Sequence, residues 1–284
     1  MSVEVAALQM NSSTDVAANL RQAEHLIAAL MQQAPQTKLI VLPEYFVQMG
    51  ASDMAKLALA ETDAIVPDAQ HPLQQWLSVT ARRYQVWLVG GTLPIRATTT
   101  KLFSSCLVVD SQGQRVARYD KIHLFDVNID AQHGHERYCE SALFQAGHSA
   151  IVVDTPAGRL GLAICYDLRF PELFRRLVEQ GMQILALPSA FTKTTGQAHW
   201  QPLLQARAIE NQVYVIASAQ TGEHGSTENS RSTYGHSMII DAWGQTMSRC
   251  TDQPGFIHAA LDLQHQQHLR QQFPVLNHRR LSTL

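Results

Sequence analysis

Short runs of apolar residues alternate along the chain with longer stretches in which apolar residues recur every three or four positions. The short runs predict buried strands, and the longer stretches predict amphipathic helices that cover a sheet. In the first third of the chain, we expect strands at 3–10, 38–43 and 86–91 and helices at 15–33 and 72–84. This order is typical of an α/β fold.

Two pairs of predicted strands are joined by short turns rather than by helices. The turn "SQG" joins 102–110 to 113–119, and the turn "PAG" joins 150–155 to 159–165. Both pairs are expected to form antiparallel hairpins. The sheets should therefore be mixed, not purely parallel.

The alternation resumes after residue 165, and no internal repeat or linker interrupts it, so one domain is expected over 1–284. Two stretches, 120–148 and 221–233, have no clear periodicity, and loops of this length in a compact domain are more often functional than idle. Further helices are predicted at 171–180, 198–210 and 262–272, and further strands at 183–188, 213–219, 235–241, 246–250 and 255–261.

Composition narrows the class of protein. The 284 residues are 45% hydrophobic and 16% charged with a net charge of −2, as in ordinary globular proteins. No basic patch favours nucleic acid or a membrane surface as a partner. Neither a signal peptide nor a membrane helix is expected. The four cysteines form no C-x-x-C pair, so we expect a reducing, cytoplasmic location.

Cys165 lies where an apolar strand stops, in "LGLAICYDLRFPELF", and Pro171 suits the first position of the helix that follows. Such a turn can present a nucleophile, because free backbone N–H groups and the helix dipole favour a thiolate and a nearby oxyanion. The alternative is a buried structural cysteine that closes the strand.

Two further polar residues directly follow apolar strands. Glu44 follows "LIVLP", and Lys121 follows the second strand of the first hairpin. Open α/β sheets bind ligands beyond such strand ends, and a poorly solvated carboxylate there can act as a general base or acid. The alternatives are a carboxylate at a helix start for Glu44 and a solvated loop charge for Lys121.

Other chemistries have weaker support. His133, His135 and Cys139 could suggest a metal, but their spacing matches no structural zinc site. The segments "GHSAI" and "GHSMI" begin like a serine nucleophile motif but lack its closing glycine, and no glycine-rich phosphate loop is present. We expect no metal and no cofactor.

Four segments in order, "LPEYF", "YDKIHLFDV", "ES" at 140–141 and "GLAICYDLRFPE", together resemble the nitrilase superfamily of carbon-nitrogen hydrolases. The resemblance extends from "VAALQM" near the start to "PVLNHRR" near the end. It implies a four-layer αββα sandwich of two mixed sheets. It also implies a catalytic set of Glu44, Lys121 and Cys165, with Glu140 supporting Lys121.

The resemblance further implies a mechanism without metal or cofactor. Glu44 would take the proton of Cys165, the thiolate would attack an amide carbonyl, and a thioester would form and be hydrolysed. Lys121 and the backbone N–H of Tyr166 would stabilise the oxyanion. Residues near strand ends or at the start of the following helix are candidate substrate contacts: Phe191, Thr192, His199 and Trp200.

The segments "PSAFTKTTGQAHW" and "QARAIENQVYVIASAQ" resemble the Nit-type branch, which implies small keto acid amides as substrates. Within that branch, "SAF", "RAIE" and "YGHSM" favour deaminated glutathione, cleaved to 2-oxoglutarate and cysteinylglycine, over 2-oxoglutaramate, the omega-amidase substrate. A nitrile substrate and a catalytically idle interaction module are the remaining alternatives. The histidine-rich segment 128–139 has no role in the family pattern.

The family also implies a homodimer, with contacts that include the C-terminal tail from about 263 to 284. The expected partner is otherwise a small amide, with no nucleic acid and no membrane. Charged residues near the Cys165 turn have structural interpretations. Asp167, Arg169 and Glu172 are expected to form a charge cluster, and Arg207 and Glu210 an i,i+3 helix pair.

Overall fold

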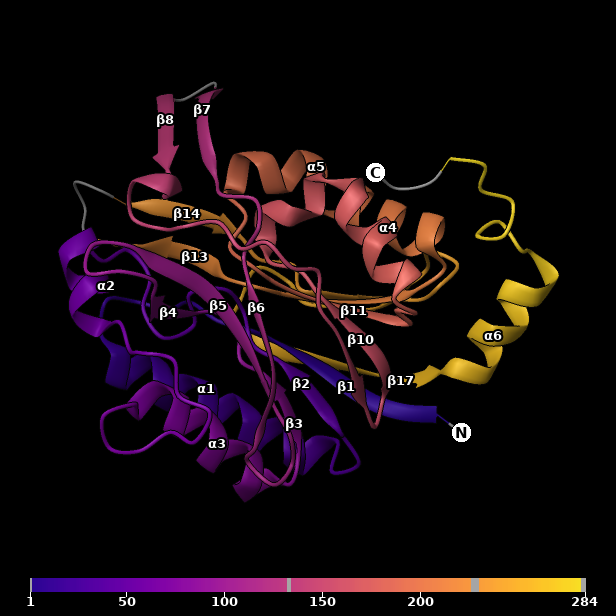
Figure 1. The fold of residues 1–284 in the computed structure, drawn as a ribbon, viewed down its shortest axis with the longest axis horizontal. Coiled ribbons are helices and arrows are strands. Elements are labelled where there is room, and N and C mark those ends of the chain that lie inside the picture. The colour runs from indigo at the N-terminus through magenta and orange to yellow at the C-terminus, as the bar shows by residue number, and fades with distance from the viewer. Residues whose placement is uncertain (1, 132–133, 226–229, 282–284) are drawn as a thin grey trace.

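Two β-sheets pack face to face, and helices cover the outer face of each (Figure 1). The computed structural model describes residues 2–131, 134–225 and 230–281. The predicted four-layer αββα sandwich with two mixed sheets is confirmed.

The first sheet has the strand order β17-β1-β2-β3-β5-β4, with β6 paired to β5. The pairs β1–β2 and β2–β3 are parallel, whereas β17, β4 and β6 join antiparallel partners. The predicted hairpin at 102–119 is β5 and β6. The strands are β1 Ser2–Gln9, β2 Leu39–Val41, β3 Trp87–Val89, β4 Leu93–Arg96, β5 Leu102–Val109, β6 Arg115–Asp120 and β17 Gly255–Asp262.

The second sheet has the strand order β16-β15-β12-β11-β10-β9. Its centre, β10–β11–β12, is parallel, and its edges are antiparallel. The predicted hairpin at 150–165 is β9 and β10. The strands are β9 Val152–Thr155, β10 Gly158–Leu162, β11 Ile184–Ser189, β12 Tyr214–Ala219, β15 Met238–Ile240 and β16 Thr246–Arg249.

Helices α1 and α3 cover the first sheet, and α4 and α5 cover the second (Figure 1). Helix α1 begins after Asp15, whose side chain accepts a hydrogen bond from the Ala18 N–H, an N-cap that satisfies a free donor of the first turn. None of the helices in the described part of the chain is both long and apolar enough to span a membrane. The helices are α1 Val16–Gln33, α2 Asp53–Leu59, α3 Pro72–Tyr84, α4 Pro171–Glu179, α5 Lys193–Asn211 and α6 Leu263–Gln272.

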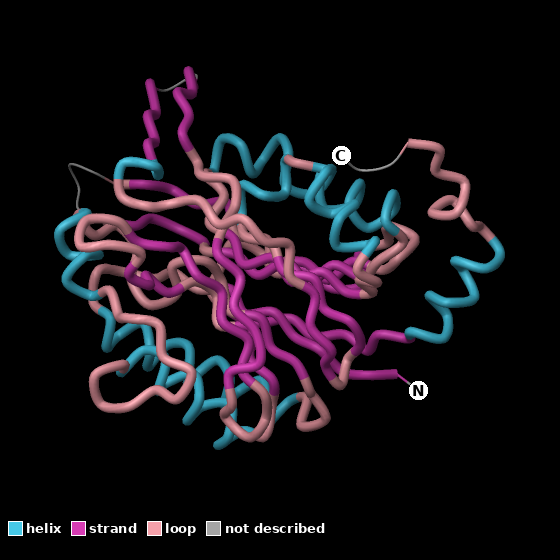
Figure 2. The backbone as a smooth tube through the Cα atoms, viewed as in Figure 1, coloured by secondary structure: helices cyan, strands magenta, loops and turns pink. Residues whose placement is uncertain are grey.

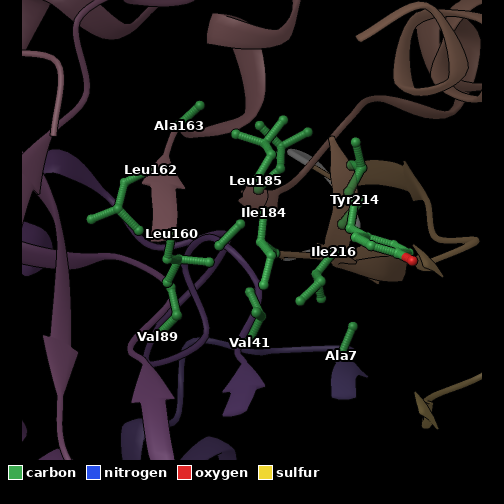
Figure 3. Packing of buried hydrophobic residues seen from close by; sticks show 14 of the residues in the cluster. Ala7, Val41, Val89, Leu160, Leu162, Ala163, Ile184, Leu185, Tyr214 and Ile216 are labelled. Atoms are coloured by element: carbon green, nitrogen blue, oxygen red, sulfur yellow. The ribbon is translucent and has the colours of Figure 1, made fainter. Parts of the chain in front are cut away.

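Strand β1 shows how the layers are built, because its alternate side chains enter different parts of the core. Val5 and Ala7 point into the core between the sheets, while Ala6 and Leu8 pack under α1 and α3. A strand with both faces buried reads as a continuous apolar run. Figure 3 shows Ala7 and Val41 of the first sheet facing Ile184 and Ile216 of the second.

The two stretches without periodicity contain regular structure that the sequence did not predict. They form the antiparallel hairpins β7 Asp126–Ala131 with β8 Gly134–Cys139, and β13 Thr221–His224 with β14 Arg231–Tyr234. Figure 2 shows the first of these projecting from the layered body. These hairpins lie outside the two large sheets, so cross-strand hydrogen bonds form them without the alternating apolar pattern of a core strand.

Two helices also differ from the prediction. Helix α2 was not predicted, since it has seven residues and buries none of them. Helix α5 begins at Lys193, ahead of the predicted 198, because the Thr192 side chain caps it by accepting from the Thr195 N–H.

Candidate active site

Glu44, Lys121 and Cys165 come together from three strand ends that are far apart in the sequence. Glu44 follows β2, Lys121 follows β6, and Cys165 follows β10, so the group joins one sheet to the other. All three side chains line one cavity of about 170 Å³. The sandwich therefore gathers the residues that the sequence placed separately.

The Lys121 ammonium group lies between two carboxylates. Its Nζ donates to Glu44 Oε1 at 2.8 Å and to Glu140 Oε2 at 2.9 Å. The exposed fractions of the Lys121 and Glu44 side chains are 2% and 1%. Charged groups this deeply buried require hydrogen-bonded partners of opposite charge, and the geometry supplies them.

Glu140 is itself held by two other donors. Its Oε2 accepts from the backbone N–H of Phe125 at 2.7 Å, and its Oε1 accepts from the Tyr45 hydroxyl at 2.9 Å. Both oxygens also face Lys121. The short 3₁₀ turn Glu140–Ala142 that follows β8 carries this carboxylate, which fixes the direction of the ammonium group.

Cys165 adopts a left-handed backbone conformation with φ of 46°. For a residue with a Cβ this conformation costs about 1–2 kcal/mol, and the rest of the fold must compensate for it. Cys165 opens the 3₁₀ turn Cys165–Arg169, and α4 begins only at Pro171. The predicted turn between strand and helix, with Pro171 at the first position of the helix, is confirmed.

The pKa values of the group follow from burial and mutual charge. Burial raises the pKa of Cys165 well above 9.0, and Glu44 raises it further, although Lys121 and the Ala190 backbone lower it in part. Desolvation therefore outweighs the stabilisation that the turn offers to a thiolate. Burial thus favours the thiol form of Cys165 in the resting site.

The pKa values of Glu44 and Lys121 are both raised. Burial raises the pKa of Glu44 above 4.5 despite the nearby Lys121. Burial alone would lower the pKa of Lys121, but the charges of Glu140 and Glu44 hold it well above 10.5. A carboxylate that hydrogen-bonds to the Cys165 thiol and has a raised pKa is a better base for it than an ordinary carboxylate.

A buried carboxylate braces the Cys165 turn. Asp167 is fully buried and accepts hydrogen bonds from the Tyr119 hydroxyl, from the backbone and ring of His123, and from the Ile164 N–H. These contacts tie the turn to the segment that carries Lys121. The expected charge cluster thus pairs Asp167 with His123, not with Arg169.

Arg207 supports the same turn from α5. Its Nη1 forms the predicted i,i+3 ion pair with Glu210 at 2.7 Å. Its Nε also donates to the Leu168 carbonyl at 3.0 Å, within the Cys165–Arg169 turn. The helix pair is therefore confirmed and has a second contact at the turn.

Two of the four candidate substrate contacts line the cavity, Phe191 and Thr192. His199 and Trp200 do not belong to the lining residues found in the described part of the chain. Trp200 packs behind Phe191, with ring centroids 4.9 Å apart, and donates its indole N–H to the His236 carbonyl. Its contribution is to hold the cavity wall.

Several lining residues were missed by sequence reasoning. They come mostly from stretches without periodicity or from charged positions that resemble surface residues. Arg169 is the clearest correction, because it lines the cavity instead of joining a charge cluster. The others include Tyr45, Phe125, Tyr138, Phe144 and Arg231.

The described residues contain no group of three or more His, Cys, Asp or Glu side chains arranged to hold a metal ion. His133 lies outside the described residues, and the side chain of His135 is not among the described side chains.

Comparison with known proteins agrees with this architecture. The profile of the carbon-nitrogen hydrolase family matches residues 4–271. A protein of Yersinia enterocolitica named deaminated glutathione amidase is 43% identical over 279 residues, which are 97% of this chain and 92% of that protein.

Solved structures agree as well. The crystal structure of the Caenorhabditis elegans NitFhit protein matches with a TM-score of 0.87 and 38% identity, covering 98% of this chain and 65% of that longer one. The crystal structure of Saccharomyces cerevisiae Nit3, a member of branch 10 of the nitrilase superfamily, matches with a TM-score of 0.85 and 32% identity, covering 99% and 97%.

The fold and these matches define a class of enzyme: hydrolases that cleave carbon–nitrogen bonds other than peptide bonds. This chain belongs to the carbon-nitrogen hydrolase family of the nitrilase superfamily and is an amidohydrolase.

Proposed function

We propose that this amidohydrolase cleaves a small 2-oxo acid amide, and specifically deaminated glutathione, to 2-oxoglutarate and cysteinylglycine. The observation that carries the chemistry is the buried Lys121 ammonium between Glu44 and Glu140, beside the Cys165 thiol. The substrate is supported by the relative from Yersinia enterocolitica, which is named for this activity and is similar over nearly the whole chain.

In the proposed acylation step, Glu44 accepts the thiol proton while the sulfur of Cys165 forms a bond to the amide carbonyl carbon. The carbonyl electrons move onto oxygen, and the charge is stabilised by Lys121 and by the backbone N–H of Tyr166. The raised pKa of the thiol favours transfer of its proton to Glu44 during attack over attack by a preformed thiolate. Lys121 keeps its proton because its pKa is raised.

Collapse of this intermediate breaks the carbon–nitrogen bond. Glu44 returns its proton to the leaving nitrogen, the amine departs, and a thioester remains on Cys165. A water molecule then gives a proton to Glu44 and its oxygen to the carbonyl carbon. The carbon–sulfur bond breaks, the acid leaves, and the proton on Glu44 restores the thiol.

The cavity suits an anionic substrate. Arg169 lines it close to the nucleophile in sequence, and its guanidinium lies over the rings of Phe191 and Tyr166 at 5.2 and 5.9 Å from their centroids. Among the described residues, no carboxylate forms an ion pair with it; a 3.2 Å contact joins it to His199 Nδ1. Arg169 can therefore bind the carboxylate of a 2-oxo acid.

The test is steady-state hydrolysis of deaminated glutathione and 2-oxoglutaramate side by side, with Cys165→Ala as the control. Release of 2-oxoglutarate reports on the first substrate and release of ammonia on the second. A strong preference for deaminated glutathione that disappears in Cys165→Ala supports the proposal. A preference for 2-oxoglutaramate would replace it with omega-amidase activity.

We also propose that the chain forms a homodimer in the cytoplasm. Trp243 packs against Phe273 of the C-terminal tail with ring centroids 5.9 Å apart, and the two residues are 55% and 52% exposed. Exposed aromatic pairs of this kind favour a subunit contact. Residues 282–284 of the tail lie outside the described part of the chain. Light scattering of the purified protein measures the oligomer.

A further inference from the structure

Arg231 lines the same cavity as Cys165 but reaches it from a different part of the fold. It begins β14, while the residues around Cys165 come from the two large sheets. Arg231 is exposed, whereas Cys165 is 7% exposed and Lys121 2%. Arg231 therefore belongs to the outer, solvent-facing part of the cavity.

The Arg231 guanidinium is held by an aromatic ring rather than by an acid. Its Cζ atom lies 4.8 Å from the ring centroid of Tyr138, in β8. Tyr138 in turn packs against Phe125, with ring centroids 5.0 Å apart. This cation–π contact joins the β7–β8 and β13–β14 hairpins across the cavity and helps to position the guanidinium.

Within the described part of the chain, Arg231 has no acidic partner. Its guanidinium forms neither an ion pair nor a side-chain hydrogen bond with the residues described there. The nearby Glu223 instead accepts from Ser230 and Ser232. By contrast, Lys56, another cation of the cavity lining, is paired with Asp53 at 3.1 Å. A fixed guanidinium with unused donors is suited to bind a carboxylate.

We propose that Arg231, positioned by Tyr138, binds a second carboxylate of the substrate, carried by the leaving group. This inference rests on the proposed function and extends it. Arg169 and Arg231 would then bind the two ends of a dicarboxylate amide. In cysteinylglycine, the carboxylate lies at the end of an extended dipeptide, about 7 Å beyond the scissile nitrogen at 3.3–3.6 Å per residue. A carboxylate at that distance from the scissile nitrogen would lie away from Cys165, in the outer part of the cavity.

Selectivity follows from this arrangement. A substrate such as 2-oxoglutaramate has no carboxylate in its leaving group, because that group is ammonia. Arg231 would contribute nothing to its binding. The enzyme would therefore favour amides with long anionic leaving groups. The contact with Arg231 is remote from the reacting atoms and equally strong in the ground state and the transition state, so its effect should appear in KM and not in kcat.

The experiment compares three substrates in the wild type and Arg231→Gln: deaminated glutathione, its glycinamide analogue, in which the terminal carboxylate is neutral, and 2-oxoglutaramate. We expect Arg231→Gln to raise KM for deaminated glutathione about tenfold, equivalent to about 1.4 kcal/mol, with little change in kcat. KM for the other two substrates should stay the same. Wild type should prefer the acid over the glycinamide, and the variant should not.

Two further variants serve as controls. Arg83→Gln removes an arginine of α3 that is 57% exposed and does not line the cavity, so all three KM values should be unchanged. Tyr138→Leu should raise KM for deaminated glutathione alone, by less than Arg231→Gln does. A merely structural loss would raise KM for every substrate alike.

If the wild type hydrolyses deaminated glutathione and Arg231→Gln has the same KM for it, this inference is overturned and the proposed function stands. An equal rise for acid and glycinamide would overturn it as well. If the wild type hydrolyses neither acid nor glycinamide, the proposed function itself fails and this inference fails with it.

Discussion

The Nζ atom of Lys121 lies 2.8 Å from Oε1 of Glu44, and both side chains are almost completely buried. Glu140 contacts the same ammonium group, so one cation is shared by two carboxylates. Loss of that cation would leave buried negative charges without a partner, which costs far more than an uncharged core of similar shape. The buried charges of the site therefore serve the reaction, but they destabilise the fold when one partner is lost.

Lys121→Met is expected to lower the free energy of unfolding by about 3–5 kcal/mol at neutral pH. Without Lys121, whose charge lowers the pKa of Glu44, that pKa rises further. A group whose folded pKa is raised destabilises the fold when it is ionised, and this cost disappears as the pH falls. Urea unfolding should therefore show a smaller loss at pH 5 than at pH 8.

The control is Lys38→Met, which removes a lysine that is exposed in the structure and should change stability by less than about 0.5 kcal/mol. An identical loss for Lys121→Met at both pH values would show that the effect is packing and not charge.

Glu140→Gln tests whether Glu140 orients Lys121. We expect kcat to fall about 10- to 100-fold, less than the roughly 100- to 1000-fold typical of removing an oxyanion donor itself. KM should change little, since Glu140 acts through Lys121. Among the effects that raise the pKa of Lys121, the charge of Glu140 is the largest. Its loss should therefore shift the alkaline limb of the pH–rate profile to lower pH. A lower kcat with an unmoved alkaline limb would contradict this role.

The pH profile tests the protonation states of Glu44 and Cys165. Glu44 must be ionised to accept a proton, and burial raises its pKa, so the acid limb of kcat/KM should lie above 4.5. Because the pKa of Cys165 is well above 9.0, no rise in rate from thiolate formation is expected near that pH. Stopped assays across pH 4 to 10 measure both features. A rate that climbs through pH 9 would indicate attack by a preformed thiolate.

Cys165→Gly and Cys165→Ala measure the backbone strain at the nucleophile. Both variants remove the thiol and should be inactive. Glycine adopts a φ of 46° without the Cβ clash, whereas alanine keeps that cost. We expect the glycine variant to be more stable than the alanine variant by about 1 kcal/mol in urea unfolding. Equal stabilities would mean that the turn is unstrained.

Much of the fold was predictable because it follows from local patterns. The short apolar runs of β1 and β12 indicated buried strands, and Pro72 and Tyr84 bound α3 where the periodicity begins and ends. The short turns between β5 and β6 and between β9 and β10 indicated hairpins for the same local reason. The β7–β8 and β13–β14 hairpins escaped prediction, because they bury no regular apolar face against the core.

Some residues of the candidate site were likewise predictable from local sequence, and others were not. Glu44, Lys121 and Cys165 stood out as polar residues directly after apolar strands, a feature visible in any one segment. Arg169 and Arg231 did not, since a charged residue on a turn or in a polar stretch reads as a solvated side chain until its surroundings are known. His199 and Trp200 were expected at the cavity because they open the predicted helix, but α5 already begins at Lys193, and neither residue is among the lining residues of the described part of the chain.

The chain's own residues were therefore enough to specify an α/β fold with mixed sheets, the order of most core strands and helices, and the residue types available for hydrolysis, since each depends on neighbours a few positions apart. Protonation and selectivity depended on contacts between distant segments. The raised pKa of Cys165, the shared ammonium of Lys121 and the position of Arg231 on Tyr138 all arise from burial and charge that exist only once the two sheets and both hairpins have come together.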